Sequence, residues 1–137
     1  MSTFLLKIYT TEHPLFEGEC ESLIVPTSDG PYGILAHHID TIASIVDGEL
    51  QFKEKGKTTF EHVAVSSGIL NVTKNEVTVL TDTAERAREI DVERAKEQCE
   101  QARKQLLSAD VVTRHLAEVK LFRAQNRLKV RSGLKTK

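Results

Sequence analysis

Two adjacent histidines, His37 and His38, lie near the end of the stretch Asp29–Asp40, whose sequence is DGPYGILAHHID. Imidazole rings bind metal ions and transfer protons, so this pair is the first candidate for chemistry. A zinc site needs three or four converging ligands, and neighbouring residues on an extended chain point to opposite sides. The remaining histidines stand far away at no ligand spacing: His13, His62 and His115. We therefore predict no metal site, with the histidines at the surface or between strands.

Nucleophilic catalysis has one weak candidate, the run Ser66-Ser67-Gly68. This run precedes an expected strand and lacks the strand–nucleophile–helix context of hydrolases, so we predict a bend between strands. No pair of acids is placed for general acid–base work, and phosphate-cradling glycine loops are absent from the sequence. Aromatic residues make up 5% of the chain, which offers little for stacking on nucleic acid bases. We predict no catalytic residues and no nucleic acid partner.

The composition is that of an ordinary globular protein, with 137 residues, 39% hydrophobic and 28% charged. The first residues, MSTFLLKIYTTEH, lack the apolar core of a secretory signal, and no run approaches the roughly 18 apolar residues that cross a bilayer. Membrane contact is therefore expected only through a partner. Cys20 and Cys99 stand alone, which favours reduced, buried thiols in a cytoplasmic setting.

The first 83 residues or so have the alternation and turn pairs of short strands. Asp47-Gly48 and Lys74-Asn75 are turn pairs that join neighbouring apolar segments. The expected strands are Phe4–Thr10, Ser22–Thr27, Thr41–Val46, Glu49–Phe52, Thr58–Val65, Gly68–Thr73 and Glu76–Thr81. This spacing predicts an antiparallel β-sandwich or flattened barrel over residues 1–85.

From Asp91 onward the apolar period changes to that of helices. One stripe consists of Val92, Ala95, Cys99, Ala102 and Leu106, and a second of Ala117, Leu121, Ala124 and Leu128. Asp91 is the expected N-cap, and Ser108-Ala109-Asp110 interrupts the pattern. We predict an antiparallel two-helix hairpin over residues 86–137. The small residues of its seam bury little apolar area, so the contact between the two helices should contribute only a few kcal/mol.

Charge divides at the same place. Residues 1–85 hold five Lys/Arg against thirteen Asp/Glu, a net charge of −8, and residues 86–137 hold fourteen against seven, a net charge of +7. One interpretation is two solvated surfaces that attract each other. The other is a basic half that meets an acidic or phosphate-bearing partner.

Four stretches, in this order, resemble the epsilon-subunit family of rotary ATP synthases, called delta in mitochondria. They are IVPTSDGPYGILAHH (Ile24–His38), AVSSGILNVTKNEVTVLTDTAERA (Ala64–Ala87), IDVERA (Ile90–Ala95) and RAQNRL (Arg123–Leu128). The resemblance implies a non-catalytic rotor subunit of the central stalk, peripheral at the cytoplasmic face of the cell membrane. Its partners would be the gamma subunit, the ring of c subunits, and the beta and alpha subunits.

The resemblance also implies roles for particular residues. A turn at the end of the sandwich would help to seat the subunit on the rotor ring and gamma, through Asp29, Gly30, Pro31, Tyr32, Gly33 and His38. The helices would act as a movable brake on ATP hydrolysis. Their basic face, which suits an acidic segment of the beta subunit, consists of Lys120, Arg123, Arg127 and Arg131.

Some bacterial members of this family bind ATP on the folded hairpin, so the resemblance implies ATP as a regulatory ligand, with no cofactor required. The matching residues are Glu85, Ile90, Asp91, Arg94, Ala95, Arg123 and Arg127. Asp91 as an N-cap and the arginines as a solvated face are the alternatives. Two other functions also stay open: a free-standing sandwich with a basic tail for acidic proteins or nucleic acid, and a hydrolase with an unrecognised site.

Overall fold

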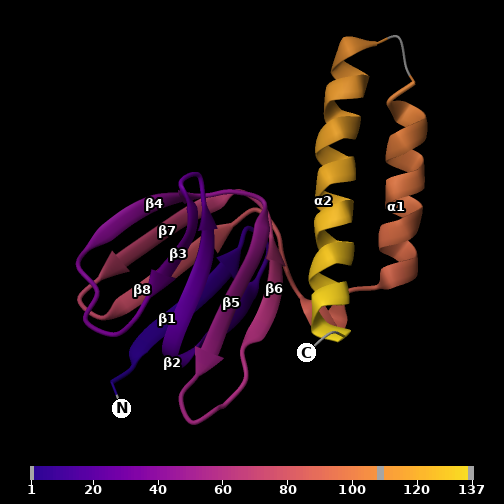
Figure 1. Ribbon diagram of the computed structural model, residues 1–137. Coiled ribbons are helices and arrows are strands. Elements are labelled where there is room, and N and C mark those ends of the chain that lie inside the picture. The colour runs from indigo at the N-terminus through magenta and orange to yellow at the C-terminus, as the bar shows by residue number, and fades with distance from the viewer. Residues whose placement is uncertain (1, 108–109, 136–137) are drawn as a thin grey trace. The chain divides into compact units, whose positions relative to one another are not determined.

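The computed structural model describes the backbone of residues 2–107 and 110–135, and side chains through residue 132. The chain divides into two compact units, Met1–Arg86 and Ala87–Lys137. Figure 1 shows that the first is built of strands and the second of two helices side by side.

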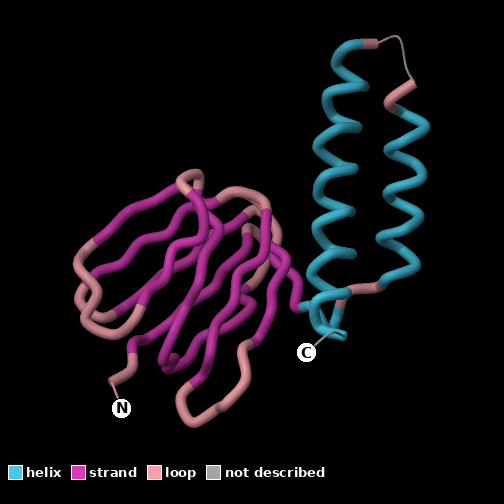
Figure 2. The backbone as a smooth tube through the Cα atoms, in the orientation of Figure 1, coloured by secondary structure: helices cyan, strands magenta, loops and turns pink. Residues whose placement is uncertain are grey.

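The first unit is a β-sandwich whose strands follow one another closely in sequence. They are β1 (Phe4–Thr10), β2 (Pro14–Thr27), β3 (Gly30–Ile34), β4 (Thr41–Ile45), β5 (Gly48–Glu54), β6 (Glu61–Val65), β7 (Gly68–Thr73), β8 (Glu76–Thr81) and β9 (Ala84–Arg86). The pairing order is β1-β8-β7-β4-β2-β5-β6-β9, with β3 on β2. Because β1 also pairs with β2, the sheet returns on itself as a flattened barrel, as Figure 2 shows.

The sandwich core follows from the alternation of the strands, since every second side chain points inward. Phe4, Leu6 and Ile8 of β1 are at most 2% exposed, while the side chains between them are half-buried. The same pattern runs through β7 and β8, whose buried and exposed residues alternate. The sandwich predicted from sequence is thus confirmed, with one difference: β1 and β8 pair in parallel.

Three parts of the sheet were not expected from the sequence. β2 begins at Pro14, eight residues before the predicted start, and β9 was not predicted at all. The prediction of a turn after Asp29 was wrong for residues 30–34, because Gly30–Ile34 form strand β3. β3 pairs with the end of β2, from Thr27↔Gly30 to Leu23↔Ile34. The bend itself is narrow, and Gly30 takes φ 106°, a conformation that suits glycine.

The second unit is a hairpin of α1 (Val92–Gln105) and α2 (Val111–Lys135), preceded by the 3₁₀ turn η1 (Ala87–Glu89). The predicted stripes lie in the seam: Ala95, Cys99, Ala102, Ala117 and Ala124 are buried, and Val92, Leu106, Leu121 and Leu128 are half-buried. Ser108 and Ala109, part of the predicted turn, lie outside the described residues. Along the described helices, no segment is long and apolar enough to cross a membrane.

Candidate functional site

The residues predicted to seat the chain on a rotor lie on β3 and its flanking turns. Pro31 and Gly33 are exposed, because β3 turns every second residue outward, and Asp29 is exposed in the turn before it. Gly30 is half-buried in the bend, where the Thr27 hydroxyl donates a hydrogen bond to its carbonyl oxygen. The outward side of this hairpin is therefore a small surface with little side-chain bulk.

Tyr32 and His38 point inward instead and contact each other. The Tyr32 Oη lies 3.0 Å from His38 Nε2, and the rings meet edge to face with centroids 5.4 Å apart. His38 Nδ1 lies 2.8 Å from the carbonyl oxygen of Ile39. A carbonyl only accepts, so in a neutral ring Nδ1 carries the proton and Nε2 accepts from the tyrosine hydroxyl. Both ring nitrogens have partners, so His38 links β3 to the loop that follows it.

Apolar side chains that the sequence analysis did not single out project from the loop that follows β3. Leu35 and Ile39 lie in the loop between β3 and β4 and are 64% and 77% exposed. We call residues 35–40 the β3–β4 loop. The sequence alone could have pointed to this loop, because the loop carries two large apolar residues among polar ones.

A second exposed apolar group lies on the outward side of neighbouring strands. Ile69 of β7 is directly opposite Leu80 of β8, which is opposite Tyr9 of β1. Ile42 of β4 is 78% exposed, and its partner on β7 is Asn71, two residues from Ile69. We call Tyr9, Ile42, Ile69 and Leu80 the outer face. Contiguous apolar side chains on neighbouring strands are typical of surfaces that bind a partner.

Charged residues border the outer face on β1. Lys7 Nζ lies 2.8 Å from Glu76 Oε1, and this hydrogen bond and charge raise the pKa of Lys7. The Tyr9 hydroxyl donates to Glu17 Oε1 at 2.9 Å, which raises the pKa of Tyr9. These contacts hold Tyr9 in a defined position at the edge of the apolar group.

The candidate ATP residues of the helical unit divide by burial. Asp91 is the N-cap of α1, since its Oδ1 accepts from the backbone N–H of Arg94 at 3.1 Å. Ile90 and Ala95 are buried, at 5% and 2% exposure, so their side chains serve packing. Arg94 is exposed on α1. The prediction of Asp91 as an N-cap is confirmed, which leaves its second carboxylate oxygen as the atom that could meet a ligand.

The two candidate arginines of α2 share one face. Arg123 and Arg127 are four residues apart, and both are half-buried. Residues equally distant from the turn of an antiparallel hairpin lie at about the same height, which puts Arg123 level with Arg94. Glu85 belongs to the other unit, where it lies on β9 opposite Ala64. The helical unit thus supplies two guanidinium groups, those of Arg94 and Arg123, at about one height and a third, that of Arg127, one helical turn away.

Arg131 differs from the rest of the predicted basic face. Lys120 is exposed, whereas the Arg131 Nη1 donates to the carbonyl oxygen of Ala87 at 3.3 Å. Arg131 Nε is buried and finds no acceptor among the described residues. In this state of the chain, Arg131 is engaged with η1 rather than presented to a partner.

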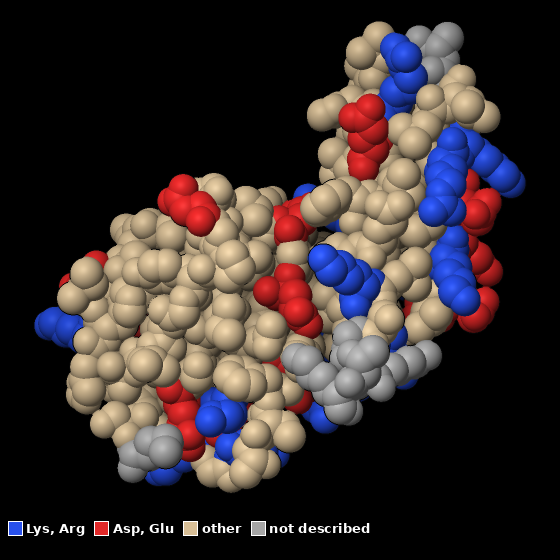
Figure 3. All heavy atoms as spheres, viewed as in Figure 1, with Lys and Arg blue, Asp and Glu red and all other residues tan. Residues whose placement is uncertain are grey.

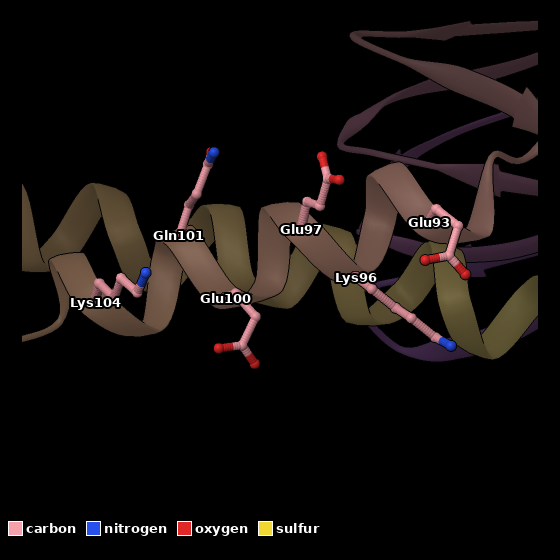
Figure 4. A pocket seen from close by; sticks show the side chains of 6 residues that line it. All are labelled: Glu93, Lys96, Glu97, Glu100, Gln101 and Lys104. Atoms are coloured by element: carbon pink, nitrogen blue, oxygen red, sulfur yellow. The ribbon is translucent and has the colours of Figure 1, made fainter.

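A shallow hollow on α1 is not a ligand site. Its lining residues all lie on that helix: Glu93, Lys96, Glu97, Glu100, Gln101 and Lys104. Figure 4 shows that these side chains point in different directions from the helix. Lys and Arg alternate with Asp and Glu along this side of the helical unit in Figure 3, and Arg103 pairs with Glu100 at 3.0 Å. The hollow is therefore part of a solvated helix face.

Metal and nucleophile sites are not formed by the described residues. No cluster of three or more His, Cys, Asp or Glu in that part of the chain could hold a metal ion. Ser66, 1% exposed, lies in the predicted bend between β6 and β7, and its hydroxyl accepts from the Thr83 backbone N–H at 2.7 Å. It therefore closes a turn.

Comparison with known proteins accounts for both units. Residues 3–87 match the family model described as the beta-sandwich domain of the ATP synthase delta/epsilon chain, and residues 88–131 match its long alpha-helix domain. The chain belongs to the ATP synthase delta/epsilon chain family. The resemblance seen in the four sequence stretches is confirmed, and family membership makes the chain a non-catalytic subunit type.

Bacterial members of the delta/epsilon family are similar over almost their whole length. The ATP synthase epsilon chain of Ruminococcus albus is 42% identical over 132 residues, covering 95% of this chain and 97% of that one. The ATP synthase epsilon chain of Desulforamulus reducens is 40% identical over 125 residues, covering 90% and 93%.

Solved structures share the fold. A chain in the OSCP/F1/c-ring structure of Euglena gracilis mitochondrial ATP synthase has a TM-score of 0.72 at 22% identity, covering 99% of this chain and 81% of that chain. A chain in the central stalk/c-ring structure of Tetrahymena thermophila mitochondrial ATP synthase has a TM-score of 0.61 at 10% identity, covering 93% and 95%.

Proposed function

We propose that this chain is a central-stalk rotor subunit of an ATP synthase. Its sandwich binds the gamma subunit and the ring of c subunits, and it reaches the cytoplasmic face of the cell membrane only through that complex. Its helices contact the beta and alpha subunits and restrain ATP hydrolysis. The observation that carries the proposal is a family-matched sandwich with large apolar side chains exposed on one end and one side.

The outer face is suited to a protein partner. Ile42, Ile69 and Leu80 are 78%, 54% and 47% exposed, so a partner that covered them would remove apolar area from water. Tyr9, fixed by Glu17, adds an aromatic group with a polar tip, a residue type enriched at protein interfaces. A helix of the gamma subunit with an apolar stripe would match this surface.

The helical unit is suited to movement because the fully buried residues of its two stripes are all alanine or cysteine. Alanine and cysteine bury little area at about 0.8 kcal/mol per CH₂, so the seam separates at a modest cost. Separation of the helices would free the basic face for the acidic segment of the beta subunit. Exposed apolar residues on α2, Val112, Leu116 and Phe122, would then gain cover as well.

ATP as a regulatory ligand has a narrower basis. Arg94 and Arg123 supply positive charge at about one height, with Arg127 one helical turn away, and guanidinium groups bind phosphate oxygens well. Asp91 has one carboxylate oxygen engaged in the cap, and Ile90 and Ala95 contribute only packing. A ligand that binds only the closed hairpin stabilises it by about 2.7 kcal/mol at a hundredfold excess over Kd.

The rotor role is tested in an ATP synthase depleted of this subunit and reconstituted with the full chain or with residues 1–88. Both chains should bind, and the shorter one should leave ATP hydrolysis faster because the helices are missing. A full chain that does not bind the depleted complex would contradict the rotor role. Equal hydrolysis rates with both chains would contradict only the restraint by the helices.

The ATP proposal has its own test, an NMR titration of the full chain with ATP. We expect the amide signals of Asp91 and Arg123 to shift, and Arg123→Gln to weaken binding at least tenfold. Arg114→Gln is the matched control, since Arg114 is exposed on the same helix nine residues away. Unchanged spectra at millimolar ATP would remove ATP as a ligand and leave the rotor role intact.

A further inference from the structure

The side chain of Asn75, in the turn between β7 and β8, reaches the β3–β4 loop. Asn75 Oδ1 accepts from the backbone N–H of His37 at 2.8 Å, although the two residues are 38 positions apart. The Asn75 Nδ2 donates to the carbonyl oxygen of Thr3 at 2.6 Å, and the Asn75 carbonyl accepts from the backbone N–H of Leu5 at 3.1 Å. One residue thus joins the chain before β1, a hairpin turn and the loop.

An asparagine suits all of these requirements. The His37 N–H needs an acceptor and the Thr3 carbonyl needs a donor, which the two ends of one amide supply. Asn75 has φ 66°, a left-handed conformation that asparagine tolerates better than most residues. An aspartate could still accept from His37 but could not donate to Thr3.

The other end of the loop is held by the same turn. Asp40 Oδ1 accepts from the backbone N–H of Lys74 at 3.3 Å. Between the two fixed points, His38 turns inward to Tyr32, and Ile39 is left 77% exposed. The ties therefore decide which side chain the loop projects.

We propose that Asn75 is a positioning residue for docking, which holds the β3–β4 loop so that Leu35 and Ile39 face the rotor ring. The inference rests on the proposed function for the identity of the partner. A loop held in its bound shape loses little conformational entropy on binding, so the ties raise affinity without touching the partner. The apolar pair requires an apolar surface on that partner.

The turn itself supplies a matched pair of variants. Asn75→Gly keeps a residue that accepts positive φ and removes both side-chain bonds. Lys74→Gly is the control, since Lys74 also has positive φ, 40°, and its exposed side chain forms no hydrogen bond or ion pair with other described residues. Glycine at position 74 keeps the backbone N–H that Asp40 accepts from.

Two measurements on the full chain decide the inference. Hydrogen exchange of the His37 amide should become about tenfold faster in Asn75→Gly and stay unchanged in Lys74→Gly. Binding to a purified gamma–c-ring rotor should weaken about tenfold in Asn75→Gly and stay unchanged in Lys74→Gly, measured at a temperature where both variants are folded. Asn75→Asp should keep His37 protected while it loses the tie to Thr3.

The outcomes separate cleanly. Unchanged His37 exchange in Asn75→Gly overturns the role of Asn75 in fixing the loop. Faster exchange with unchanged rotor binding overturns the role in docking. A wild-type chain that does not bind the rotor overturns the proposed function and the docking role with it, while the exchange measurement still decides whether Asn75 fixes the loop.

Discussion

Arg131 of α2 donates a hydrogen bond to the carbonyl oxygen of Ala87, with an Nη1–O distance of 3.3 Å. The same carbonyl accepts from the backbone N–H of Ile90 at 3.3 Å, so the end of α2 is fastened to the turn that begins the helical unit. Val130, which directly precedes Arg131, is buried at 2% exposure. The closed hairpin therefore uses a residue that the predicted basic face would present when open.

We predict that Arg131→Gln loosens the hairpin. A hydrogen bond from a charged donor contributes about 1.5–3 kcal/mol, and the buried Nε, which has no acceptor in the described part of the chain, subtracts from it, so a loss of about 1 kcal/mol is expected. Hydrogen exchange over residues 87–92 should become about fivefold faster. Lys129→Gln removes the same charge from an exposed position and is the control. Equal exchange in the two variants would show that Arg131 does not fasten the hairpin.

Cys99 offers a direct measure of hairpin opening. It lies in the seam at 3% exposure, so a thiol reagent reaches it only when the helices separate. Cys20 is at 0% exposure in the sandwich core, where burial raises its pKa to about 12. Because the thiolate is the reactive form, Cys20 should be labelled only after global unfolding.

We therefore predict that Cys99 is labelled at least tenfold faster than Cys20 under native conditions, as measured by mass spectrometry of the separated peptides. The cheap separation of a small-residue seam is the reason. If ATP binds the closed hairpin, it should slow labelling of Cys99 and leave Cys20 unaffected. Labelling of both cysteines at one rate would mean that the hairpin opens only when the whole chain unfolds.

Sequence reasoning found the elements whose signals are local. The helical seam repeats every three to four residues, so Ala95, Cys99, Ala102, Ala117 and Ala124 could be read without a structure. Asp91 could be predicted as an N-cap because capping involves only the first turn of the helix that follows it. Strands with regular alternation, such as β1 and β7, were readable for the same reason.

Features that depend on contacts between segments far apart in the sequence could not be predicted. β9 has three residues and is a strand only because it pairs with β6. β3 contains Pro31 and two glycines, which locally favour a turn, and its pairing with β2 decides otherwise. The tie between Asn75 and His37, like the parallel pairing of β1 with β8, spans more of the chain than any periodicity reports.

Asp110 gives the helical unit a dependence on pH. Its carboxylate accepts from the Thr113 hydroxyl at 2.7 Å and from the Val112 backbone N–H at 3.2 Å, which lowers its pKa below the usual 3.8. A group with a lowered pKa in the folded state stabilises that state above its unfolded pKa. The contribution is lost as pH falls through the folded pKa.

We predict that α2 loses stability below about pH 4, and that Asp110→Asn reduces this loss because the amide cannot titrate. Urea unfolding followed by helical circular dichroism at pH 7 and pH 3 measures the difference. Thr113→Val removes the hydroxyl that contributes most to the lowered pKa, so the pKa of Asp110 should rise. Identical acid losses in wild type and Asp110→Asn would contradict the assignment.

Gly68, at the start of β7, is required by a close approach of backbone. It is paired with Thr81 of β8, and a Cβ at this position would overlap the carbonyl oxygen of Leu80 and the Cα of Thr81. Neither obstacle is a flexible side chain, so the strands would have to move apart. Ser66 and Ser67 precede it and bond to Thr83 and Asp82, which fixes the approach.

We predict that Gly68→Ala destabilises the sandwich by about 3 kcal/mol, at the upper end of the cost of overpacking. Gly33→Ala is the matched control, since Gly33 is also in a strand and a Cβ there meets nothing within 4 Å. That variant should be neutral or slightly stabilising, because alanine reduces the entropy of the unfolded chain. Urea unfolding of the two variants, monitored by the sandwich amides in NMR, measures the difference. Equal stabilities would mean that β7 and β8 separate at Gly68 without cost.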